Sequence, residues 1–407
     1  MTNFIQHIPS SYKSSPLGII PEDWEVKRLG EVCTFLRNNT LSRNQLNETS
    51  GKVQNVHYGD ILVKYPSILN ARAESIPYVN QEDYKDTLNE FIEDGDVIMA
   101  DTAEDETVGK ACEIINVDSK RILAGLHTML IRPQKGLFAS SFLGYHINSD
   151  SYRRQLNALM QGIKVCSLGK QVIANTFLLA PPLPEQQHIV SVLSLWDAAI
   201  SKQTAMIEKL TLRKRGLMQQ LLTGKKRLNG FEGEWKEVRL GEICKITTGK
   251  LDANAMVNNG TYPFYTCAKE VYRINEYAFD TEALLVSGNG EHVGYVHYYK
   301  GKFNAYQRTY VLDEFRENIF YLYYALNQYL PKRILETKSN SNTPYIVMET
   351  LANMKLLLPD NNEQIAIASI LVNADKEIKI QKQKLSSLQE QKRGLMQVLL
   401  TGKRRMK

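Results

Sequence analysis

Short segments rich in Tyr, Asn, His, Arg and Lys recur along this 407-residue chain, for example RNNTLSR at 37–43 and YPFYTCAKEVYR at 262–273. Such side chains can bond to the edges of nucleic-acid bases and can neutralise phosphates. Taken singly, each segment is more often an ordinary surface loop than a binding site. The residues that could contact DNA are Arg37, Asn38, Arg43, Asn55, His57, Tyr58, Lys110, Lys164, Lys250, Tyr265, Lys269, Arg273, Asn289, His292, Arg308, Asn340 and Asn342.

Motifs that would give the chain a chemistry of its own are missing from the sequence. There is no GxxxxGK[ST] loop for nucleotide phosphates, no Asn-Pro-Pro-aromatic box of an amino-methyltransferase and no HExxH. His292 and His297 lie five residues apart, on opposite faces of a strand, and the acidic loop at 101–106 lacks the lysine spacing of a nuclease. The five cysteines form no CxxC pair. We therefore predict no catalytic residue and no metal site.

The elements that position the polar segments form a tandem repeat. KRGLMQQLLTGK at 214–225 returns as KRGLMQVLLTGK at 392–403, and the full match has 20 identities in 41 paired positions. A second repeat, W-x3-R-L-G-E-x-C, opens each half at 24–33 and 235–244. Each half therefore begins and ends with the same elements, while the residues between them diverge.

Both copies of the longer repeat have the apolar period of a coiled coil, with seam positions alternately four and three residues apart. Two helices with one such stripe each can bury their stripes against each other. We predict an antiparallel pair within the chain, each helix on the order of 58 Å long. Gln203 and Gln381 fall near its centre, where they either form a hydrogen-bonded pair or lie at a solvated edge. The seam positions are Ile189, Leu193, Trp196, Ile200, Gln203, Ile207, Leu210, Lys214, Leu217 and Leu221, then Ile367, Leu371, Ala374, Ile378, Gln381, Leu385, Leu388, Lys392, Leu395 and Leu399.

The residues between the repeats are typical of mixed α/β domains. Apolar runs precede Pro181 and Pro359, and each proline stops its run and helps to start a long helix. Strand-like runs lie at 97–100, 127–132, 175–180, 283–286, 295–299 and 353–358, and helical stretches lie near 141–160 and 317–336. The predicted segments are an arm at 1–20, a first domain at 21–184, a central helix at 185–225, a linker at 226–234, a second domain at 235–360, and a C-terminal helix with a basic tail at 361–407.

The net charge of +6 is unevenly distributed along the chain. Segments 185–228 and 363–407 carry eight and ten basic residues against three and four acidic ones, so they hold +11 and the rest holds −5. DNA binding by the domains would therefore need local patches or help from partners. The hydrophobic content of 43% fits a soluble globular protein, and the lack of an 18-residue apolar run or a leader predicts a cytoplasmic protein with no membrane span.

Glycine interrupts both repeated helix ends at the same place, at Gly216 and Gly394. Each costs about 1 kcal/mol relative to Ala in a helix. Close approach of a partner's backbone would explain why glycine occurs there twice. We predict that a partner docks on each segment, at Lys214, Arg215, Gly216, Leu217 and Met218 and at Lys392, Arg393, Gly394, Leu395 and Met396.

Taken together, these motifs resemble the specificity subunits of type I restriction–modification enzymes. The resemblance covers nearly the whole chain and rests on the W-x4-L-G-E openings, P-P-L-P-E-Q-Q at 181–187 and the L-L-T-G-K helix ends. The second copy departs at 359–363, where the sequence reads P-D-N-N-E. The resemblance implies an α/β (α+β) fold with two target-recognition domains related by pseudo-two-fold symmetry. Two long helices packed as an antiparallel coiled coil would separate them.

The resemblance also implies a function. Each domain would read one half of a split, asymmetric sequence in double-stranded DNA, with the helices as a ruler. Members of the family dock two methyltransferase subunits, which carry S-adenosylmethionine and methylate adenine, and through them restriction/translocase subunits that use ATP and Mg. This chain would then be non-catalytic and hold no cofactor. Recognition loops vary freely in the family, so the DNA-contact candidates above rest on side-chain chemistry alone.

Two other classes of function stay open on the sequence. A coiled-coil scaffold that binds no DNA would explain the helices but not two divergent, loop-rich domains. A stand-alone DNA-modifying enzyme would need the motifs that are missing.

Overall fold

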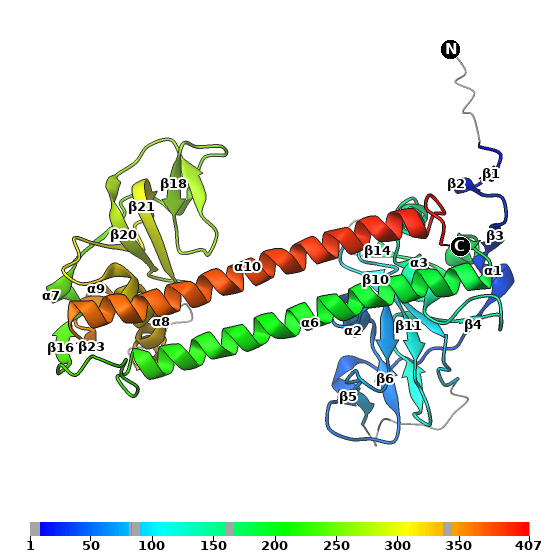
Figure 1. The fold of residues 1–407 in the computed structure, drawn as a ribbon, viewed down its shortest axis with the longest axis horizontal. Coiled ribbons are helices and arrows are strands. Elements are labelled where there is room, and N and C mark those ends of the chain that lie inside the picture. Colours follow the sequence, from blue (N-terminus) through cyan, green and yellow to red (C-terminus); the bar gives the residue numbers. More distant parts are fainter. Residues whose placement is uncertain (1–8, 81–82, 84–89, 160–165, 337–343, 407) are drawn as a thin grey trace, which may run out of the picture. The chain divides into compact units, whose positions relative to one another are not determined.

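The computed structural model describes residues 9–80, 83, 90–159, 166–336 and 344–406 (Figure 1). Contacts divide the chain into two compact units. Unit 1 comprises the chain up to Lys202 together with Leu385 onward, and unit 2 runs from Gln203 to Lys384. Each unit therefore holds part of both long helices, α6 (Leu183–Leu221) and α10 (Asn361–Leu399), so the units do not coincide with the linear segments predicted above.

Unit 1 is built on two sheets. The first has the strand order β4 (Cys33–Leu36), β13 (Thr128–Pro133), β9 (Val97–Ala100), β11 (Ala111–Ile115) and β7 (Ile68–Asn70). The second has the order β12 (Ile122–Ala124), β6 (Gln54–Val56), β8 (Tyr78–Val79) and β5 (Leu46–Asn47). Three strand pairs complete the unit: β1 (Tyr12–Ser15) with β2 (Gly18–Pro21), β3 (Glu25–Arg28) with β15 (Phe177–Ala180), and β10 (Thr102–Ala103) with β14 (Cys166–Ser167).

Strand β9 is buried on both faces, which explains its unbroken apolar sequence VIMA. Val97 and Met99 pack into one hydrophobic cluster, and Ile98 and Ala100 pack into another. Successive side chains of a strand point to opposite faces, so this strand forms the floor of two cores. The short helices of the unit are α1 (Leu29–Val32), the 3-10 turn η1 (Arg43–Gln45), α2 (Tyr58–Val63), α3 (Phe142–Ile147), α4 (Asp150–Asn157) and α5 (Lys170–Ala174).

Unit 2 has one six-stranded sheet where unit 1 has a five-stranded and a four-stranded sheet. Its strand order is β17 (Lys245–Thr248), β22 (Thr309–Asp313), β20 (Phe279–Ser287), β21 (Val296–Ala305), β18 (Tyr262–Tyr265) and β19 (Tyr272–Ile274). A separate pair joins β16 (Lys236–Arg239) to β23 (Lys355–Leu358). The helices are α7 (Leu240–Ile243), the 3-10 turn η2 (Ala253–Ala255), α8 (Ile319–Glu336) and α9 (Met348–Ala352).

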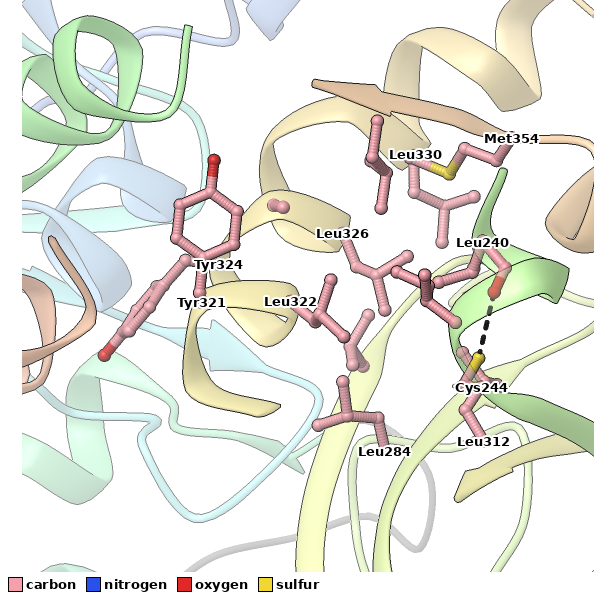
Figure 2. Close-up of a cluster of buried hydrophobic side chains, with 14 of the residues drawn as sticks. Leu240, Cys244, Leu284, Leu312, Tyr321, Leu322, Tyr324, Leu326, Leu330 and Met354 are labelled. Carbon is pink, nitrogen blue, oxygen red and sulfur yellow. Dashed lines mark hydrogen bonds between the residues drawn. The ribbon is translucent and has the colours of Figure 1, made fainter. Parts of the chain in front are cut away.

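The core of unit 2 lies between this sheet and α8. Figure 2 shows Leu284 and Leu312 of the sheet on one side of the cluster and Leu322 and Leu326 of α8 on the other. The Sγ–H of Cys244 donates to the Leu240 carbonyl at 3.3 Å. The strands at 97–100 and 353–358 and the helix at 317–336 are confirmed to within two residues, whereas β20 and β21 run further than their apolar centres indicated.

The repeated opening has the same structure in both units. Strand β3 pairs antiparallel with β15, and β16 pairs in the same way with β23. The following turn of helix approaches the domain closely. A Cβ on Gly30 would stand 2.9 Å from the Ala174 Cβ, which leaves no room for a side chain, and one on Gly241 would be in tight contact, 3.2 Å from the Ala352 Cβ. The sequence repeat therefore marks a strand and helix packed tightly against the end of each domain.

The predicted antiparallel helix pair is confirmed within the units. In unit 2 the contacts from α6 to α10 run Gln203 to Gln381 and Lys214 to Asp375, so numbers rise along one helix as they fall along the other. None of the predicted seam positions is exposed. Both helices span 39 residues, and each is followed by a glycine with a positive φ, Gly224 and Gly402, which is the usual way to end a helix.

The two seam glutamines form a hydrogen-bonded pair, which is one of the two alternatives that the sequence left open. The Gln203 Nε2 donates to the Gln381 Oε1 at 2.8 Å and to its carbonyl at 3.1 Å, and only 8% of Gln203 is exposed. A buried amide must keep a partner, so this pair opposes any shift of one helix along the other.

No helix in the described part of the chain is long and apolar enough to cross a membrane.

Removing one glutamine of the seam should cost more than removing both. Gln203→Leu leaves the Gln381 amide without its buried partner, and we expect a loss of about 1–3 kcal/mol in the free energy of unfolding. The double variant with Gln381→Leu should recover most of that loss, because both polar groups are gone. Urea unfolding of the three proteins measures the difference. Equal losses in the single and double variants would contradict the pairing.

Candidate nucleic-acid interface

Three aromatic rings meet at the start of α2 in unit 1. The Nδ1 of His57 accepts a hydrogen bond from the Gly59 N–H at 3.1 Å and so caps the helix. The centre of the Tyr58 ring lies 4.6 Å from that of His57 and 5.4 Å from that of His127. Burial lowers the pKa of His57, which agrees with a neutral ring whose Nδ1 accepts. Tyr58 and His127 keep accessible surface and can meet a ligand.

His127 joins this group although the sequence placed it in a strand. Its φ is +54°, an uncommon value for a residue other than glycine. Its Nδ1 lies 3.6 Å from the Asp101 Oδ1, and the side chain is 48% exposed. Nothing in the sequence marks the positive φ, so its place beside Tyr58 could not be predicted.

The polar loop at 37–43 lies against the same corner of unit 1. Asn38 donates to the backbone carbonyl of Gly125, two residues before His127, at 3.3 Å. Arg43 forms a 2.6 Å ion pair with Asp60 while about half of its side chain stays exposed. We call the following residues the α2 cluster: Asn38, Asn39, Arg43, His57, Tyr58 and His127.

Two other predicted contact residues of unit 1, Asn55 and Lys110, make hydrogen bonds within the protein. Asn55 is fully buried and accepts a hydrogen bond from Asn39 at 2.5 Å, so it positions a neighbour of the cluster. Lys110 donates to the Leu62 carbonyl at 2.8 Å, and burial lowers its pKa. Arg37 is exposed next to Asn38. Lys164 lies outside the described residues.

Contacts of Gln307 and Arg308 bring four loops of unit 2 together. The Arg308 carbonyl accepts from the Gly288 N–H at 2.8 Å and from the Cys267 Sγ at 3.3 Å. The Gln307 N–H donates to the Leu251 carbonyl at 2.9 Å, which brings Lys250 near Arg308. The loops carry exposed cations and polar side chains. We call them the β20 loop cluster: Lys250, Lys269, Asn289, His292 and Arg308.

Tyr265 was predicted to contact DNA, but it is buried in a second hydrophobic cluster of unit 2, with Phe303 and Val311. Only 4% of it is exposed, and its ring packs against His297 and Phe303 with centres 5.2 and 5.8 Å away. Burial raises the pKa of Tyr265 to about 12. Arg273 is exposed on the edge strand β19. Asn340 and Asn342 lie outside the described residues.

A buried carboxylate fixes the start of α6. Glu185 accepts from Arg405 through both its oxygens at 2.8 Å, from the Trp24 Nε1 at 2.9 Å and from the Met406 N–H at 3.0 Å. Burial alone would raise the pKa of Glu185, but these hydrogen bonds outweigh burial and hold the pKa below its ordinary value. The C-terminal tail is thereby tied to the opening element of unit 1.

The same contact recurs at the start of α10. Glu363 is fully buried and accepts from both donors of Arg227 at 2.7 Å and from the Trp235 Nε1 at 3.2 Å. The linker after α6 therefore does in unit 2 what the tail does in unit 1. Sequence reasoning missed Arg227 and Arg405, because the repeat was matched only as far as L-L-T-G-K. Their signal was the pair of basic runs, K-K-R and K-R-R, that follow at the same spacing.

The glutamine after each glutamate secures the preceding loop. Gln186 donates to the Pro181 carbonyl at 2.8 Å and accepts from the Ala139 N–H at 2.8 Å. Gln364 makes the equivalent bonds to Pro359 at 3.0 Å and from the Asn318 N–H at 3.1 Å. These contacts account for the repeated Glu-Gln pair.

The predicted docking segments are only partly open to a partner. Lys214 and Lys392 form ion pairs with Asp375 and Asp197 inside the chain. Leu217, Met218, Leu395 and Met396 pack beside hydrophobic clusters. Arg215 and Arg393 are exposed, and a Cβ on Gly216 or Gly394 would meet no atom within 4 Å. The fold of the chain itself therefore does not require these two glycines.

Within the described residues, no group of three or more His, Cys, Asp and Glu is arranged to hold a metal ion. Each unit carries one group of cations, amides and aromatic rings, the α2 cluster in unit 1 and the β20 loop cluster in unit 2. Comparison with known proteins matches residues 21–211 and 232–390 to the family described as type I restriction modification DNA specificity domain. The chain belongs to this family.

The relatives found by sequence are named as specificity subunits of type I restriction enzymes. Over 168 residues the chain is 41% identical to the type I restriction enzyme EcoDI specificity subunit of Escherichia coli, covering 41% of this chain and 37% of that protein. It is 24% identical to the MjaVIII specificity subunit of Methanocaldococcus jannaschii, over 95% of this chain and 94% of the relative.

Solved structures share the fold of this chain. The S subunit of a type I system from M. genitalium covers 92% of this chain and 96% of its own with a TM-score of 0.57 at 16% identity. A chain from a study of complex assembly and conformational transition of the type I system covers 94% and 99% with a TM-score of 0.59 at 20% identity. At these identities the likeness shows the architecture alone.

The contribution of Arg405 to the stability of the folded chain should depend on pH. Arg405→Ala leaves the Glu185 charge buried and uncompensated, and we expect a loss of about 3 kcal/mol in the free energy of unfolding at pH 7. Because the folded-state pKa of Glu185 lies below its unfolded value, the stability from this pair is present above about pH 4.5 and is lost as pH falls through the folded pKa. The difference between wild type and variant should shrink accordingly near pH 4.

The matched control is Arg404→Ala, which removes the exposed neighbouring arginine. It should change stability by less than about 0.5 kcal/mol at either pH. Unfolding curves at pH 7 and pH 4 measure both variants. A loss from Arg405→Ala that is the same at the two pH values would contradict the assignment of Glu185 as the charged partner.

Proposed function

We propose that this chain is the DNA-reading subunit of a type I restriction–modification complex and recognises a split, asymmetric target in double-stranded DNA. One observation carries the proposal. The frame elements recur with the same contacts in both units, while the parts that bear the exposed loops differ, with two sheets in unit 1 and one six-stranded sheet in unit 2. Repeated frame elements that carry two different recognition domains fit a target whose two parts differ in sequence.

The two loop clusters have the chemistry that such reading needs. The α2 cluster combines Arg43 with amides and aromatic rings, and the β20 loop cluster combines Arg308 and two lysines with Asn289. Arginine and asparagine can form paired hydrogen bonds to guanine and adenine in the major groove, while lysines neutralise phosphates. Two half-sites on one face of a duplex lie about 34 Å apart, which two helices of 39 residues can span.

The chemistry of methylation and cleavage would come from other subunits. We place two methyltransferase subunits on the two KRGLM segments. Restriction/translocase subunits would bind to the methyltransferase subunits. S-adenosylmethionine, ATP and Mg would be bound by these partners, in the cytoplasm, and this chain would be non-catalytic. The support is that Arg215 with Gly216 and Arg393 with Gly394 present the same open surface twice.

The methylome of a host cell tests the function directly. The chain is expressed with its neighbouring methyltransferase, and single-molecule sequencing compares this host with one that lacks the chain. We expect a new split motif with methylated adenine in both halves. Unchanged methylation would overturn the proposed function and favour a scaffold.

Variants of the two clusters then assign the halves of the motif. Tyr58→Ala should relax one half and Arg308→Ala the other, because a good base contact discriminates by about 1–3 kcal/mol. Lys245→Ala, which breaks an exposed ion pair with Glu314 outside both clusters, is the control and should change neither half.

Docking on the glycine segment has its own test. Gly394→Leu adds a side chain into space that no atom of the chain occupies within 4 Å, so the fold should tolerate it. If a methyltransferase backbone approaches there, its affinity should fall by about tenfold or more, because the new side chain clashes with it. Titration of the methyltransferase by calorimetry measures the change. An unchanged affinity would count against docking at this segment.

A further inference from the structure

A tyrosine, an aspartate and a lysine meet at one point in unit 1. The Tyr145 Oη donates to the Asp197 Oδ2 at 2.6 Å, and the Lys392 Nζ donates to the Asp197 Oδ1 at 2.5 Å. The lysine also lies over the tyrosine ring, 5.0 Å from its centre. The three groups therefore contact one another in all three pairs.

The same arrangement occurs in unit 2. The Tyr324 Oη and the Lys214 Nζ donate to the two oxygens of Asp375 at 2.7 and 2.6 Å, and the lysine lies 5.2 Å from the centre of the tyrosine ring. We call these two groups the Tyr–Asp–Lys triads. Their recurrence at equivalent positions of two divergent domains indicates a shared role.

Each triad joins three different elements. The tyrosine comes from a helix of the domain, α3 in unit 1 and α8 in unit 2, and the aspartate and lysine come from opposite long helices. Other contacts of Tyr145 with α6 and α10 are apolar, in the cluster that holds Ile189 and Leu399. Apolar contacts have no direction, whereas charged hydrogen bonds fix both distance and angle.

The lysines stand where an apolar residue would stabilise the helix pair more. Lys214 and Lys392 occupy seam positions, and only 21% and 14% of their side chains are exposed. A polar residue at a seam position lowers stability and specifies alignment. Burial together with donation to the aspartate raises the pKa of Tyr145 and of Tyr324, so both remain donors at physiological pH.

We propose that the Tyr–Asp–Lys triads are positioning residues that set the angle of each recognition domain on the helical frame. They thereby limit which spacer lengths between the two half-sites are accepted. The proposal rests on the proposed function, since it concerns how two reading surfaces are held for one split target. Their contribution lies in alignment, and the apolar clusters supply most of the stability.

The test uses Tyr324→Phe, which removes one hydroxyl and lies outside the predicted docking segments. The whole complex, with methyltransferase, is given a pool of targets whose half-sites are separated by the native spacer or by one base pair more or fewer. We expect the preference for the native spacer over its neighbours to fall by about tenfold, the size of effect that one charged hydrogen bond can have. Methylation at each spacer is expressed relative to the native spacer, so weaker partner binding does not imitate the effect.

A lysine variant supplies a second test, and a variant of the neighbouring arginine is its control. Lys214→Met removes the triad cation, keeps an apolar stem in the seam and should relax the spacer preference without lowering the melting temperature. Arg213→Met removes the adjacent ion pair, which joins Arg213 to Glu377 at 2.7 Å on the exposed side, and should leave the preference unchanged.

The outcomes separate the two proposals. A wild-type complex that methylates no split motif would overturn the proposed function and this inference with it. A wild type that methylates a split motif, with Tyr324→Phe and Lys214→Met keeping its spacer preference, would overturn the positioning role alone. A lower melting temperature with an unchanged preference would make the triads merely structural.

Discussion

Burial of one apolar stripe on α6 against one on α10 is the interaction on which the other elements depend. An isolated helix of this length with such an apolar stripe is not stable in water unless a partner covers the stripe. Within each unit the paired helix segments then offer a surface to the domain: Leu371 and Ile367 pack with α8 in unit 2, and Ile189 and Leu193 pack with Phe142 in unit 1. The domains are therefore organised by the seam, although they contribute most of the residues.

Polar groups decide how that apolar contact is aligned. The glutamine pair, the lysines of the seam and the buried glutamates at the helix starts all bury polar or charged atoms, which costs free energy unless each finds its partner. A helix pair shifted by one turn would leave Glu185 without Arg405 and Gln203 without Gln381. A wrong alignment would leave these polar groups unpaired, so their pairing specifies how the two helices align. The loops that bear the α2 cluster and the β20 loop cluster lie outside the helical frame, and they differ between the two units.

The frame could be predicted from the sequence because its signals are local and repeated. The 4–3 spacing predicted the helices, and their equal apolar stripes predicted that the helices pair. The sequence left open whether the two glutamines bond to each other. The site was less accessible to prediction. Tyr265 and Asn55 look like contact residues in the sequence, yet their burial depends on strands distant in the chain. His127 reaches the α2 cluster through a backbone angle that no residue type announces. Lys214 and Lys392 were predicted to dock a partner, because nothing local in the sequence shows that their acidic partners lie on the other helix.

The division of the long helices between the units affects how the protein folds during its synthesis on the ribosome. Unit 2 is one continuous stretch of chain, from Gln203 to Lys384, and can fold once that stretch has emerged. Unit 1 is discontinuous, and its missing part, from Leu385 onward, is synthesised after the whole of unit 2. Until then Ile189 and Leu193 lack the contacts of Leu399 and Leu400, and Glu185 lacks Arg405. Exposed apolar surface on a waiting segment favours aggregation, and contacts between residues so distant in sequence form slowly. The first domain to be translated is thus the last to be completed, and during that interval it is the part of the chain most in need of a chaperone.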